Sequence, residues 1–353
     1  MAKTPFKVLV VDDSAVSRQA IIEIANESED LQVVGQAENG YQALELIPRL
    51  KPDLVTLDII MPKMNGLTTL KNIMIFHPVS TIMLSSLTQE GVNITFDALR
   101  YGAIDFIAKP SVLEGQNPLK IQAVQITQKM RLAARVKIGS IQYIRAKPNL
   151  DKERYFRQKI ACKNIVVLGV AEGGYGTLLK VILRLKPDSF SAYMVIFYET
   201  SQHVDSFIDY LNNYCDVSVQ RPQNNRLVES GICYISSGEE YVTVHGKRGQ
   251  LFFHVSSAPF SSRRGTIDML MFSVAETIGE HALGVILSGD GTDGSEGLEE
   301  IIRVGGSAII QAPVNCLYKS MTLSALNMCE AEIVAADTEI AAQINAFLPK
   351  LNF

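Results

Sequence analysis

Five polar residues follow short apolar runs in the first third of the chain. Asp12 and Asp13 follow the first run, Asp58 the third, Ser85 the fourth and Lys109 the fifth. If the runs are parallel strands, these side chains meet at one edge of a sheet, where α/β proteins bind ligands. Carboxylate oxygens suit a hard cation such as Mg²⁺, which often takes one or two carboxylates together with waters and phosphate oxygens. The pattern therefore predicts metal-assisted phosphoryl chemistry.

Asp58 is the candidate nucleophile, because a carboxylate can accept a phosphoryl group when a metal and nearby cations neutralise the developing charge. The Ser85 hydroxyl and the Lys109 ammonium are placed to contact that group. The simpler alternative is that the aspartates cap helices and that Lys109 extends into solvent. Five suitable residue types at successive strand ends favour the phosphoryl site.

The first 136 residues alternate between these runs and amphipathic stretches, which predicts a doubly wound parallel sheet with helices on both faces. The expected strands are Lys7–Val11, Val33–Gln36, Asp53–Leu57, Thr81–Leu84 and Phe106–Ala108. Helices are expected from Ser14 and over Tyr41–Leu46, Thr68–Ile75, Val92–Tyr101 and Asn117–Val136. Residues 137–162, rich in Lys, Arg and Gln, are expected to be a linker.

A second parallel α/β domain, Rossmann-like in class, is expected over residues 163–353. It opens with a strand from Asn164 and a turn containing Gly169, Gly173 and Gly174. These glycines do not form G-x-G-x-x-G, so a dinucleotide site is disfavoured. The remaining strands are expected at Tyr193–Phe197, Ile232–Ile235, Leu251–His254, Leu283–Leu287 and Ala308–Gln311, and helices at Leu178–Leu185, Asp268–Ile278 and Gly294–Val304.

Composition excludes several classes of protein. Apolar residues make up 47% of the 353 and charged residues 20%, as in globular proteins. A net charge of -4 lacks the basic character of a nucleic-acid binder. No apolar stretch approaches the roughly 20 residues that cross a bilayer, so neither membrane insertion nor export is expected. Five scattered cysteines without C-x-x-C favour reduced thiols and a cytoplasmic location.

Residues 7–110 carry VLVVDDS, LDIIMPKMNG, a serine pair after the fourth run, and DFIAKP. They resemble the receiver domain of bacterial response regulators, which has a flavodoxin-like fold. The resemblance implies that Asp58 is phosphorylated by a sensor histidine kinase and that Phe106 is the aromatic switch residue. The Mg²⁺ ligands and phosphoryl contacts that it implies are the Asp12, Asp13 and Asp58 carboxylates, the Ile59 carbonyl oxygen, Ser85 and Lys109.

Residues 163–346 resemble the catalytic domain of the chemotaxis protein-glutamate methylesterases, the CheB family. The resemblance rests on LGVAEGGYG at Leu168–Gly176, the expected strand and helix from Tyr193 to Leu211, RRGTIDMLMFSVAE at Arg263–Glu276, and GVILSGDGTDGSEGL at Gly284–Leu298. A receiver, a linker and an effector domain in this order agree with that family. The implied partners are a chemotaxis (CheA) type kinase and methyl-accepting receptors.

The family hydrolyses esters with a Ser-His-Asp triad, which this sequence keeps only in part. Asp293 matches the acid, whereas Ala171 stands at the serine position and Tyr198 at or beside the histidine position. A methyl group cannot attack an ester, and a tyrosine with a pKa near 10 is a poor base at neutral pH. Another register would place His203 at the histidine position. Two further family positions, a histidine and a hydrophobic residue, hold Arg263 and Asp290.

Other residues of this region leave some chemistry open. Ser288 and Glu172 are the remaining candidate nucleophiles, but neither has a histidine nearby in the sequence. Glu172, Asp290 and Asp293 could together bind a cation, although solvated loop carboxylates are the simpler interpretation. The C-terminal half contains no basic helix-turn-helix unit, so a transcription factor is not favoured. The leading hypothesis is a receiver that controls a domain without hydrolytic activity, which acts by binding. The alternative is an active protein-glutamate methylesterase/protein-glutamine glutaminase.

Overall fold

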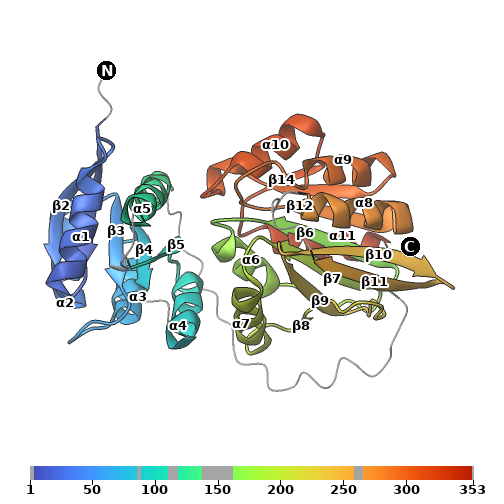
Figure 1. The fold of residues 1–353 in the computed structure, drawn as a ribbon, viewed down its shortest axis with the longest axis horizontal. Coiled ribbons are helices and arrows are strands. Elements are labelled where there is room, and N and C mark those ends of the chain that lie inside the picture. Colours follow the sequence, from blue (N-terminus) through green and yellow to red (C-terminus); the bar gives the residue numbers. More distant parts are fainter. Residues whose placement is uncertain (1–3, 86–88, 110–117, 137–161, 258–264, 352–353) are drawn as a thin grey trace. The chain divides into compact units, whose positions relative to one another are not determined.

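The computed structural model describes residues 4–85, 89–109, 118–136, 162–257 and 265–351. Contacts divide the chain into two units, Met1–Ile144 and Arg145–Phe353 (Figure 1). The expected linker up to residue 161 and Arg263 lie outside the described residues. Within the described parts, no helix has the length and apolar character needed to cross a lipid bilayer, and all five cysteines are free thiols.

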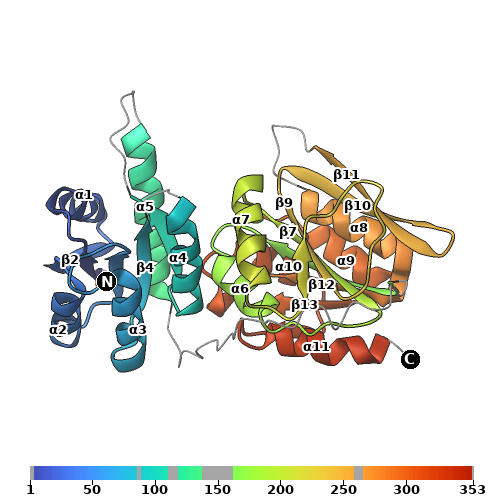
Figure 2. The same ribbon diagram turned by 90° about the horizontal axis from the view of Figure 1, so that it is seen from below.

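The first unit is the expected doubly wound fold. Its described strands form one parallel sheet in the order β2-β1-β3-β4-β5. The strands are β1 (Phe6–Val11), β2 (Leu31–Ala37), β3 (Leu54–Asp58), β4 (Ser80–Ser85) and β5 (Asp105–Ala108). The helices are α1 (Ala15–Asn26), α2 (Gly40–Leu50), α3 (Gly66–Phe76), α4 (Gln89–Arg100) and α5 (Pro118–Arg135). In Figure 2, α1 and α5 lie on one face, and α2 and α3 on the other.

Side chains on both faces of this sheet are excluded from water. Val8 to Val11 in β1 and Leu54, Val55 and Leu57 in β3 have no exposed surface. Such continuous apolar runs are typical of strands covered by helices on both faces. The N-cap side chains of Ser14, Asn39 and Asn65 accept hydrogen bonds from the first turns of α1, α2 and α3. The sequence thus fixes where each helix starts after its strand.

The second unit contains a seven-stranded parallel sheet in the order β14-β13-β12-β6-β7-β9-β8, described with a separate antiparallel hairpin, β10-β11. The strands are β6 (Asn164–Val170), β7 (Ser191–Phe197), β8 (Ser218–Gln220), β9 (Ile232–Ser237), β10 (Glu240–Lys247), β11 (Gln250–Ser257), β12 (Ala282–Ile286), β13 (Ser307–Gln311) and β14 (Ile333–Ala335). The helices are α6 (Tyr175–Ile182), α7 (Ser201–Asn212), α8 (Thr266–Ile278), α9 (Ser295–Arg303), α10 (Ser320–Met328) and α11 (Ile340–Leu351).

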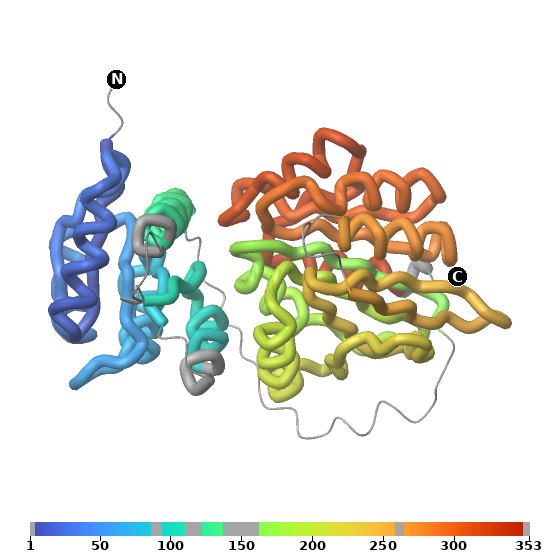
Figure 3. Tube along the Cα trace, viewed as in Figure 1, coloured from blue at the N-terminus to red at the C-terminus, as the bar shows by residue number. Residues whose placement is uncertain are grey.

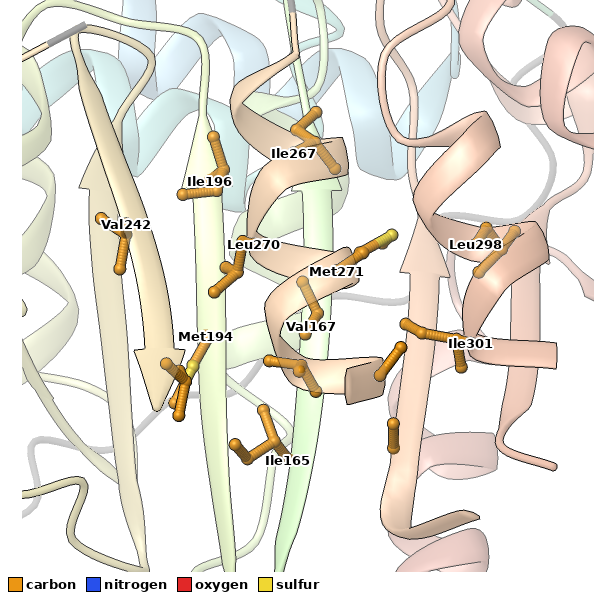
Figure 4. Close-up of a cluster of buried hydrophobic side chains, with 14 of the residues drawn as sticks. Ile165, Val167, Met194, Ile196, Val242, Ile267, Leu270, Met271, Leu298 and Ile301 are labelled. Carbon is orange, nitrogen blue, oxygen red and sulfur yellow. The ribbon is translucent and has the colours of Figure 1, made fainter. Parts of the chain in front are cut away.

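The core of this unit joins the sheet to α8, α9 and the hairpin (Figure 4). Ile165 and Val167 on β6 and Met194 and Ile196 on β7 meet Ile267, Leu270 and Met271 on α8, Leu298 and Ile301 on α9, and Val242 on β10. Helix α8 packs between the hairpin and α9, and Ile267 in its first turn lies beside Gly169 near the carboxyl end of β6.

Several elements of the second unit differ from the sequence-based expectations. The structure adds β8, β10, β14, α10 and α11, which the apolar pattern did not reveal. β8 and β14 are three-residue edge strands, too short to show a period. Helix α6 begins at Tyr175 rather than Leu178, because Gly174 is its N-cap, and it ends at Ile182.

Candidate functional site

The carboxyl ends of β1, β3 and β5 bring three aspartates and a lysine together. One carboxylate oxygen from each of Asp12, Asp13 and Asp58 lies within 4.8 Å of the others. Lys109 Nζ is 2.9 Å from Asp12 Oδ2 and 2.8 Å from Asp58 Oδ2. Asp12 and Asp58 are buried, whereas Asp13 is exposed. The cluster therefore combines hard oxygen ligands with an adjacent ammonium group.

Burial and the contacts of Lys109 act in opposite directions on the ionisation of this cluster. Burial raises the pKa of Asp58, although hydrogen bonding and charge attraction from Lys109 oppose this effect. For Lys109, burial alone would lower the pKa, but its hydrogen bonds to Asp58 and Asp12 outweigh burial and raise it. Lys109 therefore stays an ammonium ion beside the candidate phospho-acceptor.

The loop between β3 and α3 lies close to the main-chain atoms of Asp58. Gly66 N donates to Ile59 O at 2.9 Å, so that carbonyl oxygen already accepts one hydrogen bond. A Cβ atom added at Gly66 would lie 2.0 Å from Asp58 O. Only glycine therefore allows α3 to begin this close to the end of β3.

Ser85 is the last residue of β4, and Phe106 lies within the neighbouring strand β5. Ser85 is buried, and its hydroxyl oxygen accepts a hydrogen bond of 3.5 Å from Thr95 Oγ1 on α4. Phe106 is half-buried, and Lys129 Nζ lies 5.7 Å from its ring centroid. Sequence reasoning missed Thr95 and Lys129, since no strand-end pattern marks residues on α4 and α5.

In the second unit, the ends of three adjacent strands bring the methylesterase-like positions together. β6 lies between β12 and β7. Ala171 N, at the end of β6, donates to Ser288 O after β12 at 3.3 Å, and Tyr198 N, after β7, donates to Val170 O at 3.0 Å. Ala171 is buried. This is the edge at which parallel α/β sheets form ligand sites.

Tyr198 contacts Asp293 directly. The Tyr198 hydroxyl donates to Asp293 Oδ2 and accepts a hydrogen bond of 2.9 Å from Thr266 Oγ1. Burial and the neighbouring Asp293 carboxylate raise the pKa of Tyr198, so its hydroxyl stays protonated at neutral pH. The group beside the acid is therefore a hydrogen-bond donor rather than a base.

Asp293 also caps a helix that is distant in the sequence. Its carboxylate accepts from Ile267 N at 3.0 Å and from Asp268 N at 3.1 Å, both in the first turn of α8. In return, Asp268 Oδ1 accepts from Gly297 N at 2.7 Å in the first turn of α9. The residues at both N-cap positions are glycines without a capping side chain, Gly265 and Gly294. The two aspartates therefore cap each other's helices.

The other candidate groups are engaged elsewhere. His203 lies on α7 with Nδ1 at 3.3 Å from Glu199 Oε2, whereas Tyr198 is the residue that contacts Asp293. The Ser288 hydroxyl donates to Tyr318 O at 3.0 Å and accepts from Tyr318 N at 3.3 Å. Glu172 accepts from the Tyr318 hydroxyl at 3.5 Å, and Asp290 accepts from Ser320 Oγ at 2.7 Å.

Comparison with known proteins gives matches to both units. Residues 166–344 match the family model described as CheB methylesterase, and residues 8–115 match the response regulator receiver domain. A Vibrio vulnificus protein, named protein-glutamate methylesterase/protein-glutamine glutaminase 2, is 33% identical over 332 residues, which cover 92% of this chain and 93% of that protein.

A second relative and a solved receiver domain are also similar to this chain. A Bacillus licheniformis protein named protein-glutamate methylesterase/protein-glutamine glutaminase is 33% identical, with 98% of this chain and 99% of that protein covered. The solved response regulator domain of Thermotoga maritima CheB is 44% identical and covers 38% of this chain and 100% of its own, with a TM-score of 0.35. The two family models and the relatives at 33% identity show that the chain belongs to the CheB family, with a response regulator receiver domain followed by a CheB methylesterase domain.

Proposed function

We propose that this chain is a response regulator that is phosphorylated on Asp58 and that controls its C-terminal domain through this modification. The observation that carries the proposal is the buried Asp58 carboxylate, which lies 2.8 Å from Lys109 Nζ and within 4.8 Å of oxygens of Asp12 and Asp13. Such a carboxylate, beside an ammonium group and an acidic metal-ligand set, has the environment that phosphoryl transfer to aspartate requires.

The acidic cluster fits Mg²⁺, since its donors are hard oxygen atoms. The carboxylates of Asp12, Asp13 and Asp58 would hold the ion, and the Ile59 carbonyl oxygen stays a predicted fourth ligand. When bound, Mg²⁺ supplies positive charge that offsets the charge of an incoming phosphoryl group. Lys109 would pair with a phosphoryl oxygen, Ser85 would donate a hydrogen bond to it, and Phe106 would transmit the change to the surface.

The proposed partners follow from the family. A chemotaxis (CheA) type histidine kinase would donate the phosphoryl group, and methyl-accepting receptors would be bound by the second domain. We expect both encounters in the cytoplasm. The proposed domain limits are 1–136 for the receiver and 163–353 for the methylesterase domain, with 137–162 as the linker.

For the second domain we propose that hydrolysis has been lost and that binding remains. Three observations support this proposal. Ala171 offers no nucleophile, Tyr198 stays protonated beside Asp293, and the Ser288 hydroxyl is engaged with the Tyr318 main chain. Without a serine and a base, an orienting acid such as Asp293 has no reaction to assist.

The alternative is an active protein-glutamate methylesterase/protein-glutamine glutaminase. The names of the relatives, which align over nearly the whole chain, favour this alternative more than they favour a loss of activity. Such an enzyme would need a different nucleophile, for which Ser288 and Glu172 are the candidates.

One set of assays decides these points. Intact-mass analysis with a small-molecule phosphodonor and Mg²⁺ should show one phosphoryl group on the wild type and on Glu45→Gln, a control that removes an exposed carboxylate from α2. Asp58→Asn should show none, and labelling of this variant at the wild-type level would refute the site. Methanol release from methylated receptor, with and without phosphodonor, should stay at background. Turnover that Ser288→Ala or Glu172→Gln abolishes would establish the alternative.

A further inference from the structure

The hairpin β10-β11 extends beyond the other strands of the second unit, as Figures 1 and 3 show. Its turn consists of two residues, because Lys247 pairs with Gln250 across the hairpin. Both turn residues have positive φ, 53° at Arg248 and 74° at Gly249. A tight turn of this kind favours Asn, Asp or Gly at its first position, where an arginine is strained by about 1 kcal/mol. The arginine is therefore not explained by the needs of the turn.

The outer face of the hairpin tip carries cations beside an aromatic surface. His245 and Lys247 on β10 lie opposite Phe252 and Gln250 on β11, while Val244 and Phe253 point into the core. The His245 and Phe252 rings stack at 6.0 Å with an interplanar angle of 27°. Lys247 and Arg248 are exposed, and within the described residues neither forms an ion pair.

These side chains line a hollow of about 430 Å³, which we call the hairpin hollow. Its lining is Asn225, His245, Lys247, Arg248, Gln250 and Phe252. The lining contains no carboxylate and is rich in hydrogen-bond donors, although the chain as a whole has a net charge of -4. A local excess of positive charge in an acidic protein is an electrostatic site for an anion.

The chemistry of the lining selects among anions. The guanidinium of Arg248 presents a planar fork that matches phosphate oxygens, and Lys247 adds a point charge. The Phe252 ring beside these cations offers a surface for a planar ring, and the Asn225 and Gln250 amides can bond to its polar edge. The volume is that of a small-molecule site, which ranges from roughly 300 to 1,000 Å³. We propose that the hairpin hollow binds a nucleoside diphosphate.

The test is titration of the full-length protein with ADP by calorimetry. The buffer contains EDTA, so that the acidic cluster of the receiver cannot contribute through a metal. We expect a Kd below about 1 mM. Arg248→Asn, which suits the turn better than arginine, should weaken binding about tenfold, since a charge-assisted hydrogen bond is lost. Lys247→Gln should weaken it by a similar factor. Arg49→Gln, which removes an exposed charge from α2, is the matched control and should change nothing.

Two further measurements test whether the nucleoside ring contributes to binding and whether ADP binds at the hairpin. Pyrophosphate should bind more weakly than ADP, and Phe252→Leu should weaken ADP without weakening pyrophosphate. ADP should slow amide exchange in peptides that span residues 240–257. The proposal is overturned by absence of ADP binding at 1 mM, by ADP affinity unchanged in both charge variants, or by pyrophosphate binding as tightly as ADP. Displacement of ADP by lower concentrations of an oligoglutamate peptide would identify an acidic protein segment as the ligand and would equally overturn it.

Discussion

Replacing Asp293 should destabilise the second domain whether or not that domain hydrolyses esters. Its carboxylate accepts two main-chain hydrogen bonds from the first turn of α8 and one from the Tyr198 hydroxyl. Gly265, the N-cap of α8, has no side chain that could replace it. Asp293→Ala therefore leaves several partly buried donors without an acceptor.

The magnitude follows from these contacts. Loss of a helix N-cap costs about 1 kcal/mol, and a buried donor left without a partner costs about 1–3 kcal/mol. Because these costs overlap, we expect the free energy of unfolding to fall by about 3 kcal/mol. For a domain of this size each kcal/mol lowers the Tm by roughly 2–4 °C. The expected loss is therefore about 6–12 °C for Asp293→Ala and less for Asp293→Asn, which keeps one acceptor oxygen.

The measurement is scanning calorimetry of the full-length protein, combined with amide exchange of peptides from Thr266–Ile278 to assign the transition. Asp290→Ala is the matched control, since Asp290 lies in the same loop but bonds only to the Ser320 hydroxyl in the described structure. It should lower the Tm by less than about 2 °C, in the range of a surface substitution. Equal losses in Asp290→Ala and Asp293→Ala would refute the capping argument.

Four other outcomes are expected. Burial, and then the neighbouring Asp293, raise the pKa of Asp268 to about 7. Protonated Asp268 therefore stabilises the second domain below pH 4, and this stabilisation should be lost as the pH rises through 7. In denaturant titrations at several pH values, Asp268→Asn should flatten this dependence, and an unchanged slope would contradict it. Gly66→Ala should lower receiver stability by at least about 1 kcal/mol, measured by urea unfolding, because its Cβ would meet Asp58 O at 2.0 Å; an unchanged midpoint would contradict this. Phosphorylation of Asp58 should change amide exchange outside residues 1–135, and no change there would argue against receiver control. The single variant Ala171→Ser should show no ester hydrolysis above background. The double variant Ala171→Ser with Tyr198→His should hydrolyse ester at a rate equal to or higher than that of the single variant. Higher activity in the single variant would contradict the need for a base.

Much of the fold could be predicted from the sequence because its strands are continuous apolar runs. The receiver strands and the order of helices around them followed from this signal, and the helix expected at Asp268–Ile278 is α8, two residues longer at its start. The three-residue strands β8 and β14 could not be predicted, since their pairing depends on the sheet beside them rather than on their own pattern. Strand β10 has the alternating burial of a half-exposed hairpin, and its partner β11 was the part that the sequence revealed.

Site residues at strand ends could also be predicted from the sequence, whereas contacts between helices distant in the sequence could not. Parallel strands brought Asp12, Asp58 and Lys109 together, as their positions predicted. The cross-capping of α8 and α9 was not foreseen, because an acceptor 25 residues away leaves no local pattern. The only signal was indirect: both helices begin at a glycine, so each needed an acceptor from elsewhere.

The cross-capping changes how Asp293 should be weighed as evidence for hydrolysis. A carboxylate that accepts two main-chain hydrogen bonds from the start of α8 is required by the fold whether or not a serine and a histidine accompany it. In the described structure the same oxygen that accepts from α8 also accepts from Tyr198, so the tyrosine adds a donor to a cap that is already formed. Such a tyrosine satisfies the acid as a histidine N–H would, yet it supplies no base. The presence of Asp293 therefore supports the CheB fold and is not in itself evidence for hydrolysis.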